Sequence, residues 1–385
     1  MEISEKSLIQ TKGGSCSMNL SKLRTFEAIA VCCIIVLNKI ILNPTKNIIY
    51  ETGSSSVLNI IYVCLLAILL SVGIWKVFSK FPNSDVLDIA EFSFGKTFKW
   101  FFAVAFLIYF LFVCSISVRS FVENIKIFYQ KELDLRFLLI IFLLAAAIAN
   151  RKGVGLVGRV ASFITPLTIW GIFLTFISVT GLFNWYRIFP ILGYGINETF
   201  FTGASNLYAF SSLSVLLFLP PLLEKKADLK KVTMITTIIT SLMLIFSITC
   251  MVLALSFSFT SSALSPMYLV IRSIEWGSFF ESPEAIFTFI FILSMISFLS
   301  VFMMVSLYII SKIGKLKNGT TLSLSLAEIV LGASLIAKDI PSLNFLESVI
   351  YKYFSLIFVF GITSLVLLVG YFKKKGANHP DETME

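Results

Sequence analysis

The chain has few charged residues and almost no histidine. Only 14% of its 385 residues are Asp, Glu, Lys or Arg, whereas soluble proteins carry about a quarter. The single histidine, His379, lies in the C-terminal tail, and the six cysteines show no CxxC spacing. Such a composition argues against a soluble domain, a disulfide framework, a metal centre and acid–base catalysis. We therefore expect no enzymatic activity, no metal and no cofactor.

Apolar residues take the place of the missing charges and make up 57% of the chain. A helix needs about 20 mostly apolar residues to cross the hydrocarbon of a bilayer. Ten segments approach or reach this length. They are residues 24–49, 57–77, 98–121, 135–150, 158–181, 197–223, 231–256, 284–311, 320–337 and 349–372. The predicted fold is an all-α polytopic membrane protein with ten transmembrane helices and the lipid bilayer as its surroundings.

Lysine and arginine are unevenly distributed between the two sides of the predicted membrane domain. They are concentrated in the N-terminal tail (1–23), in the connections that follow even-numbered spans, and in the C-terminal tail (373–385). The positive-inside rule therefore predicts that both termini are cytoplasmic. This asymmetry accounts for most of the net charge of +9, so no nucleic-acid partner is expected. Residues 1–20 are polar and lack a signal-peptide cleavage site.

Two connections are predicted to lie along the membrane surface. Residues 79–97 have the pattern of a short interfacial helix that turns Leu87, Ile89, Ala90 and Phe94 towards lipid. On the outer side, residues 263–281 mix aromatic and apolar residues, as interfacial or lid-like segments do. The remaining connections are short, so we expect no soluble domain.

One apparent nucleotide-binding motif is rejected on context. Gly153, Gly155 and Gly158 match the GxGxxG pattern, which binds dinucleotides only between a strand and a helix and with an acidic residue about 20 positions later. Here an apolar helix precedes the motif, a span follows it, and Ser178 stands at the acidic position. The three glycines are predicted to form a tight turn between two spans.

The first span contains a lysine and a helix break. Lys39 follows Asn38, and Asn43-Pro44 comes four residues later. A charge near the bilayer centre costs roughly 2.5–3.5 kcal/mol, and Pro44 interrupts the helical hydrogen bonds. Broken helices at this depth are typical of transporter binding sites. The alternative is a shorter span, 23–42, whose Lys39 snorkels to the headgroups.

We expect the first helical half to end near residue 37 and a second half to begin at Pro44, with Asn43 as its N-cap. The positive end of that second half and the nearby Lys39 would favour a carboxylate or another anionic ligand group.

A second polar interruption is predicted in the sixth span, five spans later. It carries Asn206, Tyr208, Ser211 and Ser212 near its middle. Breaks in the first and sixth helices fit a five-plus-five inverted repeat, with residues 24–181 and 197–372 as the two halves and a ligand site at the midplane. The alternative for the serines and asparagines is ordinary packing between helices.

The candidate ligand residues are Asn38, Lys39, Asn43, Tyr109, Asn206, Tyr208, Ser211 and Ser212. Four polar residues, one of them in this set, have two or more interpretations. Tyr109 either closes the pocket with its hydroxyl or packs in the core. Ser297 and Ser300, on one face with Ser294, either ligate a small cation or serve helix packing. Glu328 is a proton site, a partner for Lys39, or a subunit contact.

Several short sequence strings resemble the B subunits of bacterial spore germinant receptors. The strings are Val118–Ile125, Arg159–Pro166, Phe189–Ile196, Phe218–Pro220 and Ser265–Glu275, within a resemblance that covers residues 20–315 most clearly. That family belongs to the amino acid–polyamine–organocation superfamily. The resemblance implies an inverted-repeat transporter fold and a sensor for a small nutrient, typically an amino acid. It also implies the spore inner membrane or cell membrane as location, and receptor A and C subunits as partners.

The chain departs from this family at the predicted site. The family usually has glycines before the proline of the first span, where Asn38, Lys39 and Asn43 stand here. It tends to have an acidic residue after the sixth-span break, where this chain has serines such as Ser214. Besides a receptor subunit, an ion- or proton-coupled amino-acid transporter and a structural subunit with a degenerate pocket are both compatible with the sequence.

Overall fold

The structure is a computed structural model. It describes residues 22–42, 44–128, 134–225, 228–257, 260, 265–274, 283–316 and 319–377. Within these ranges the chain is helical apart from short connections, and no β-strand is formed beyond one isolated bridge between Leu23 and Leu223. Seven helices are long and apolar enough to cross a membrane. The prediction of an all-α polytopic membrane protein is confirmed at this level.

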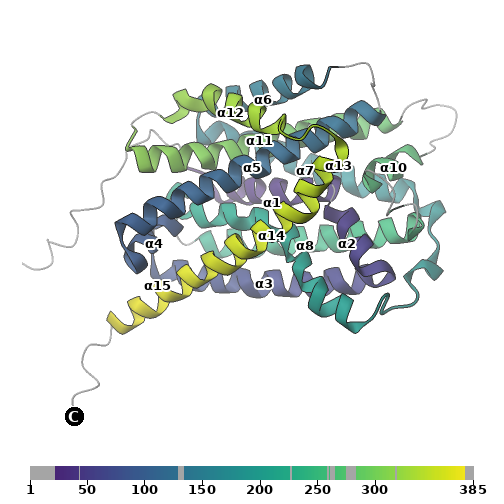
Figure 1. Ribbon diagram of the computed structural model, residues 1–385, viewed down its shortest axis with the longest axis horizontal. Coiled ribbons are helices and arrows are strands. Elements are labelled where there is room, and N and C mark those ends of the chain that lie inside the picture. Colours follow the sequence, from purple (N-terminus) through teal and green to yellow (C-terminus); the bar gives the residue numbers. More distant parts are fainter. Residues whose placement is uncertain are drawn as a thin grey trace, which may run out of the picture.

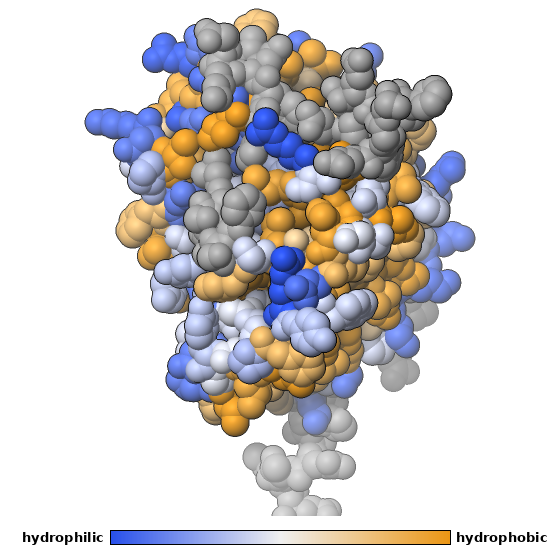
Figure 2. Space-filling model, turned by 90° about the vertical axis from the view of Figure 1, so that its right-hand side faces the viewer, coloured by the Kyte–Doolittle hydropathy of each residue, from blue (hydrophilic) through white to orange (hydrophobic). Residues whose placement is uncertain are grey.

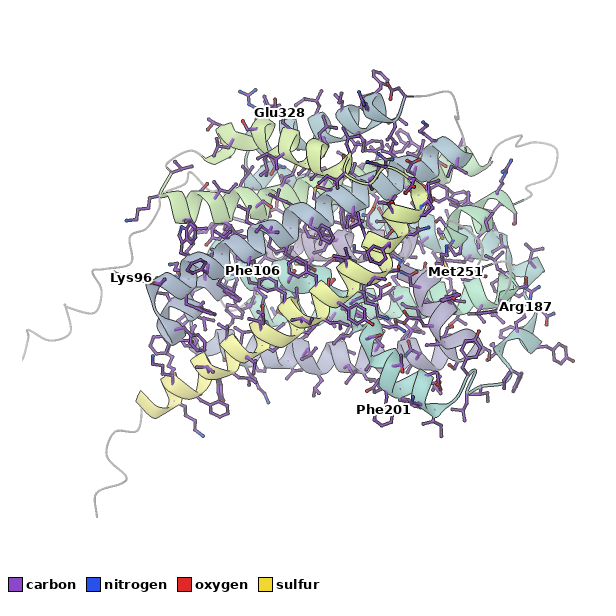
Figure 3. The ribbon with its side chains drawn as sticks, in the orientation of Figure 1. Lys96, Phe106, Arg187, Phe201, Met251 and Glu328 are labelled. Atoms are coloured by element: carbon purple, nitrogen blue, oxygen red, sulfur yellow. The ribbon has the colours of Figure 1, made fainter. Side chains whose placement is uncertain are left out.

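The helices form a bundle whose long axis is horizontal in Figure 1. The longer helices are α1 (Thr25–Ile41), α3 (Ser56–Lys80), α5 (Lys96–Phe128), α6 (Leu135–Arg151), α7 (Val154–Ser178), α8 (Leu229–Ala254) and α11 (Pro283–Gly314). The shorter helices are α2 (Pro44–Thr52), α4 (Val86–Phe94), α10 (Pro266–Arg272), α12 (Ser323–Ser334) and α13 (Ile340–Phe345). Lys96 and Arg187 lie at opposite ends of the bundle (Figure 3). Since most helices run between these ends, the ends correspond to the two sides of the membrane.

The first helix, α1, forms the centre of the bundle. It packs against α7, α8, α11 and the sixth-span helix, and it lies among these helices in Figure 1. Every residue from Ala30 to Ile41 is buried. A helix that is apolar on all sides is typical of such a fully enclosed position. Any polar side chain on this helix is therefore surrounded by protein.

The predicted break in the first span is present but shorter than expected. Helix α1 continues to Ile41 rather than ending near residue 37, and Leu42 then adopts an extended conformation. Helix α2 starts at Pro44, as predicted. Asn43 lies outside the described residues. The break therefore consists of about two residues, and Asn38 and Lys39 belong to the last turn of α1.

The sixth span takes a different form from the predicted break. It stays helical throughout, as a π-wound segment η4 (Asn197–Phe201) followed by a 3₁₀-wound segment η5 (Thr202–Phe218). The last helix is also partly π-wound, in η10 (Leu346–Tyr351) and η11 (Ser355–Ile362), which flank α14 (Lys352–Phe354) and precede α15 (Thr363–Ala377). Non-α winding within helices frequently marks functional positions. The expected interruption is thus a change of winding rather than a gap in the helix.

The interfacial helix predicted in 79–97 exists as α4, but its predicted lipid face is wrong. Leu87, Ile89 and Ala90 are fully buried, and only Phe94 is half-exposed. Helix α4 packs on α5 and α15, so its apolar face covers protein. The spacing of apolar residues identified the apolar face of α4 correctly. It could not show whether lipid or protein covers this face, because both are apolar.

Ion pairs fasten α4 to the end of α11. Asp85 caps α4 and is completely buried. Lys312 donates to Asp85 at 2.6 Å and to Asp88 at 2.7 Å, and the Tyr308 hydroxyl donates to Asp85 at 2.8 Å. Burial raises the pKa of Asp85. Burial also acts to raise the pKa of Asp88, but the Lys312 ammonium outweighs it and lowers that pKa. These contacts hold α4 against the end of α11.

The turn predicted for the three glycines between two spans is formed by Gly153 alone, because Gly155 and Gly158 belong to the first turns of α7. Gly153 separates α6 from α7 and has a φ angle of +92°, which favours glycine. In the other predicted surface connection, α10 is short and Tyr268 is buried. Residues 275–282, which include Trp276, lie outside the described residues.

Candidate functional site at the break of the first helix

Lys39 is enclosed by protein at the end of α1. Only 2% of the residue is exposed. Its ammonium nitrogen lies 4.4 Å from the centre of the Tyr351 ring and 5.7 Å from the centre of the Phe298 ring. Aromatic faces attract cations, most strongly where water is excluded. The ammonium therefore points into the bundle, and the snorkelling alternative does not describe its position.

Two oxygen-bearing groups act electrostatically on Lys39. They are the carboxylate of Glu347 and the hydroxyl of Tyr109. Glu347 lies in η10, is 3% exposed, and accepts a hydrogen bond from Ser120 Oγ at 3.2 Å. Within the described residues, Lys39 forms no ion pair closer than 4.0 Å. The Glu347 carboxylate at longer range and the two aromatic ring faces stabilise its positive charge. The ammonium can therefore still contact a ligand oxygen.

Hydroxyl groups from three helices meet beside Lys39. The Ser211 and Tyr351 hydroxyl oxygens lie 2.6 Å apart, and the Tyr109 and Ser355 hydroxyl oxygens lie 3.3 Å apart. All four residues are buried. They come from η5, α5 and the last helix. Together with Lys39 of α1, the site therefore combines residues from the first and the last helix of the bundle. Such hydroxyls donate and accept hydrogen bonds and can therefore orient a small polar ligand.

Tyr208 connects the sixth span to the break in the first. Its hydroxyl donates to the carbonyl oxygen of Pro44 at 3.4 Å and accepts from Asn47 Nδ2 at 3.3 Å. Its ring meets that of Tyr351 edge-on at 5.9 Å. Tyr208 thus links the sixth span to the first turn of α2, which directly follows the break.

A polar cavity of about 400 Å³ lies between α2 and the segment from α13 to α14. It is lined by Lys46, Asn47, Tyr50, Glu51, Asn344, Glu347, Ser348, Val349, Lys352 and Tyr353. Lys352 donates to both carboxylate oxygens of Glu51 at 2.6 Å. Figure 2 shows the end of the molecule to which α2 and α13 belong, where hydrophilic residues lie among apolar surface. Because Tyr351 sits between Glu347 and Lys352 in the sequence, the cavity adjoins the Lys39 cluster.

The two predicted asparagines of the spans bind neighbouring helices. Asn38 Nδ2 donates to Ser294 Oγ at 2.8 Å, which joins α1 to α11. Asn206 Nδ2 donates to Asn59 Oδ1 at 3.0 Å, which joins η5 to α3. Both side chains are fully buried. These contacts are of the interhelical kind that polar residues form in membranes. Ser212 is also fully buried, next to Ser211 in η5.

The remaining predicted residues are not brought to Lys39 in one group. Ser297 is buried in α11 and its hydroxyl has no hydrogen-bond partner, while the Ser300 hydroxyl donates to the carbonyl of Ile296 at 2.7 Å. Glu328 is exposed on α12 and lies at the edge of the molecule in Figure 3. Lys39, Tyr109, Tyr208 and Ser211 are the predicted residues that the structure assembles around one point.

Sequence reasoning missed the last helix as a source of site residues. Glu347, Tyr351 and Ser355 recur at four-residue spacing, which places them on one face of a helix. The predicted span began at residue 349, so Glu347 was left in a connection. The spacing of these three polar positions in an otherwise apolar span was the available signal.

The sequence matches a known family over most of its length. The family model described as "Spore germination protein" matches residues 22–342. The curated protein named Spore germination protein KB, from Bacillus subtilis (strain 168), is 21% identical over 348 residues, which cover 85% of this chain and 93% of that protein.

Solved transporter structures share the fold. The structure of MhsT in complex with L-phenylalanine has a TM-score of 0.65 at 13% identity and covers 91% of this chain and 88% of its own. The substrate-bound, outward-open structure of a Na⁺-coupled sialic acid symporter has a TM-score of 0.58 at 12% identity and covers 90% of this chain and 89% of its own. These similarities extend over nearly the whole bundle and concern the fold alone.

Proposed function

Because this chain belongs to the spore germination protein family, we propose that it is the membrane subunit of a spore nutrient-germinant receptor. In this proposal it binds a small nutrient, such as an amino acid, at the break between α1 and α2, and binding triggers germination. The observation that carries the proposal is the buried ammonium of Lys39, which, among the described residues, has aromatic ring faces and no ion pair around it. A ligand carboxylate would bind this ammonium, and the Ser211 and Tyr351 hydroxyls would add hydrogen bonds.

We propose that ten helices cross the membrane as two inverted repeats, residues 24–181 and 197–372. Helices α1, α6 and α12 would supply three further spans in addition to the seven long apolar helices. Helix α6 has 17 residues, which span about 25 Å, so modest adjustment of the bilayer would accommodate it. Ten spans place both termini on one side, and the excess of basic residues on that side supports a cytoplasmic location.

The proposed setting is the spore inner membrane or the cell membrane, with receptor A and C subunits as partners. The family assignment supports this setting. The proposed function is binding without catalysis. Neither partner needs to contact the Lys39 cluster, which lies inside the bundle.

A coupled amino-acid transporter is the second candidate function. It is favoured by the similarity to a Na⁺-coupled symporter and to MhsT, the latter solved with L-phenylalanine. In this version the positive charge of Lys39 would stand in for a bound cation, and a proton or ion gradient would drive transport.

Reconstitution into proteoliposomes separates the two functions. For a receptor subunit we expect saturable binding of a labelled amino acid or related nutrient without accumulation inside the vesicle, with or without an ion or proton gradient. Saturable, gradient-driven uptake by this chain alone would favour the transporter. The absence of saturable binding for any member of an amino-acid and sugar panel would refute the nutrient-binding proposal.

A further inference from the structure

A membrane-facing apolar groove of about 190 Å³ runs between α3, η5 and the last helix, away from the Lys39 cluster. We call it the α3–α15 groove. Its lining includes Ala67, Ser71, Gly73 and Val77 of α3 and Thr363, Ser364, Leu367 and Leu368 of α15. Leu69 and Leu368 at its edges are 68% and 48% exposed. Small residues on its floor and exposed leucines at its rim make a channel that is open to the hydrocarbon of the bilayer.

The shape of the groove fits a single hydrocarbon chain. From Ala67 to Val77 the lining of α3 extends over ten residues, or about 15 Å, which is about half of the hydrocarbon thickness. A Cβ atom added at Gly73 meets no heavy atom within 4 Å, so the space beside this glycine is empty. A protein helix, about 10–12 Å wide with its side chains, is too thick for a groove of this volume.

Three lysines follow the groove-lining segments of α3 and α15 in the sequence, at the same end of both helices. Lys80 follows the last groove residue of α3, and Lys373 and Lys374 follow the last groove residues of α15. The Lys374 ammonium donates to the carbonyl of Lys80 and lies 4.1 Å from the centre of the Phe81 ring. The Lys80 ammonium lies 3.6 Å from the centre of the Tyr371 ring.

Lys373 donates to the carbonyl of Phe92 at 3.1 Å. Among the described residues, none of these three lysines forms an ion pair with a carboxylate. Carbonyl oxygens and ring faces therefore hold the Lys80 and Lys374 ammonium groups between the ends of α3 and α15 that follow the groove. Figure 1 shows α3 and α15 approaching one another towards this end of the bundle, and their contact is direct.

We propose that the α3–α15 groove binds one acyl chain of an anionic phospholipid, whose phosphate is held by Lys80 and Lys374. The apolar groove would hold the acyl chain, and the two ammonium groups would favour a headgroup with a negative charge. Basic clusters next to spans attract anionic lipids, and each lysine near the surface adds to the affinity. This inference is independent of the proposed ligand site and of the receptor function.

The test uses the whole chain in nanodiscs that contain equal amounts of phosphatidylglycerol and phosphatidylcholine. After extraction into detergent, native mass spectrometry counts the lipids that remain bound. We expect one phosphatidylglycerol per chain in preference to phosphatidylcholine. Replacing Lys80 and Lys374 by glutamine should lower this preference by about fivefold per lysine, whereas the surface variant Lys152→Gln, at the same end of the bundle, should leave it unchanged.

Filling the groove provides a second, independent variant. Gly73→Phe should expel the lipid because its ring occupies the empty space, whereas Gly332→Phe on α12, where an added Cβ also meets nothing within 4 Å, should retain it. Size-exclusion profiles check that each variant remains folded. An unchanged lipid count and preference in both the Gly73 and the lysine variants would overturn the proposal.

A photo-crosslinking residue at position 364 identifies the occupant directly when the chain is in its native membrane. An adduct with the mass of an anionic phospholipid supports the proposal. An adduct with another protein, or with phosphatidylcholine-type lipids at their bulk proportion, would overturn it.

Discussion

Replacing Lys39 with methionine should stabilise the protein slightly while weakening ligand binding. The buried ammonium costs about 2.5–3.5 kcal/mol at the bilayer centre. Its placement 4.4 Å from the Tyr351 ring centre returns about 2 kcal/mol as a desolvated cation–π contact. Methionine has a similar length and removes both contributions, and the buried Glu347 carboxylate keeps the Lys46 ammonium as a nearby cation, so we expect a net stabilisation of about 1 kcal/mol. A buried charge retained despite this cost is typical of a functional residue.

The effect on binding has the opposite sign. A hydrogen bond to a charged group contributes about 1.5–3 kcal/mol, so loss of the Lys39 ammonium should weaken binding of a carboxylate-bearing nutrient by about 10- to 150-fold. Thermal unfolding in detergent and equilibrium binding of labelled nutrient measure the two effects. Lys39→Arg keeps the positive charge and is the control that separates the effect of losing the charge from other effects of substitution. Unchanged affinity in Lys39→Met, at normal protein level, would refute the assignment of Lys39 to the ligand site.

Three further substitutions test other parts of the structure. Tyr351→Phe keeps the ring beside Lys39 but removes the hydroxyl 2.6 Å from Ser211, so unfolding stability should fall by about 1 kcal/mol. Asp88 has a pKa below its ordinary value of 3.8 despite burial, because of the Lys312 ammonium; its contribution to stability should be complete above about pH 4 and disappear as the pH falls through the lowered pKa. Melting temperatures measured from pH 6 to pH 3 should therefore fall less steeply in Asp88→Asn. Gly203→Ala should cost about 1–3 kcal/mol, because the added Cβ would collide with Asn59 Nδ2 of α3 and would lie 2.8 Å from the backbone oxygen of Glu198.

Matched variants give these measurements a reference. Gly332→Ala adds the same methyl group at a site with open space and should not destabilise the protein. Ser348→Ala removes a hydroxyl from the same helix as Tyr351 but outside the buried network. Equal melting temperatures for Gly203→Ala and Gly332→Ala would contradict the close packing of α3 against the sixth span, and an equal pH slope in Asp88→Asn and the unmodified chain would contradict the Lys312 interaction.

Local chemistry made the break in the first span predictable. Asn43-Pro44 is a helix start whatever surrounds it, and α2 begins at Pro44 as expected. The burial of Lys39 followed from the same reasoning, because a restart at Pro44 lengthens the span and moves the lysine inward. The end of α1 was less predictable, because tertiary contacts such as that of Asn38 with Ser294 hold its last turn in helical form.

The partners of Lys39 could not be read from local sequence. Tyr351 and Glu347 approach it only through the tertiary fold, and the polar residues Glu347 and Lys352 weakened the apolar signal at the start of the last span. The prediction that α4 turns its apolar face towards lipid was wrong for a related reason. Hydrocarbon tails and buried side chains are equally apolar, so spacing on a helix shows which face is covered without showing what covers it.

The distance in sequence between Lys39 and its aromatic partner has a consequence for the order of synthesis. Tyr351 follows Lys39 by about 300 residues, which a ribosome adds in roughly 15–60 s at 5–20 residues per second. During that time the first helix is in the membrane while the ring that receives its ammonium does not yet exist. Nascent chains that end before residue 340 should therefore leave Lys39 accessible to an amine-reactive label, and full-length chains should protect it. The site is therefore completed only after the helix that contains Tyr351 has been synthesised, and a shorter nascent chain carries the Lys39 ammonium without this aromatic partner.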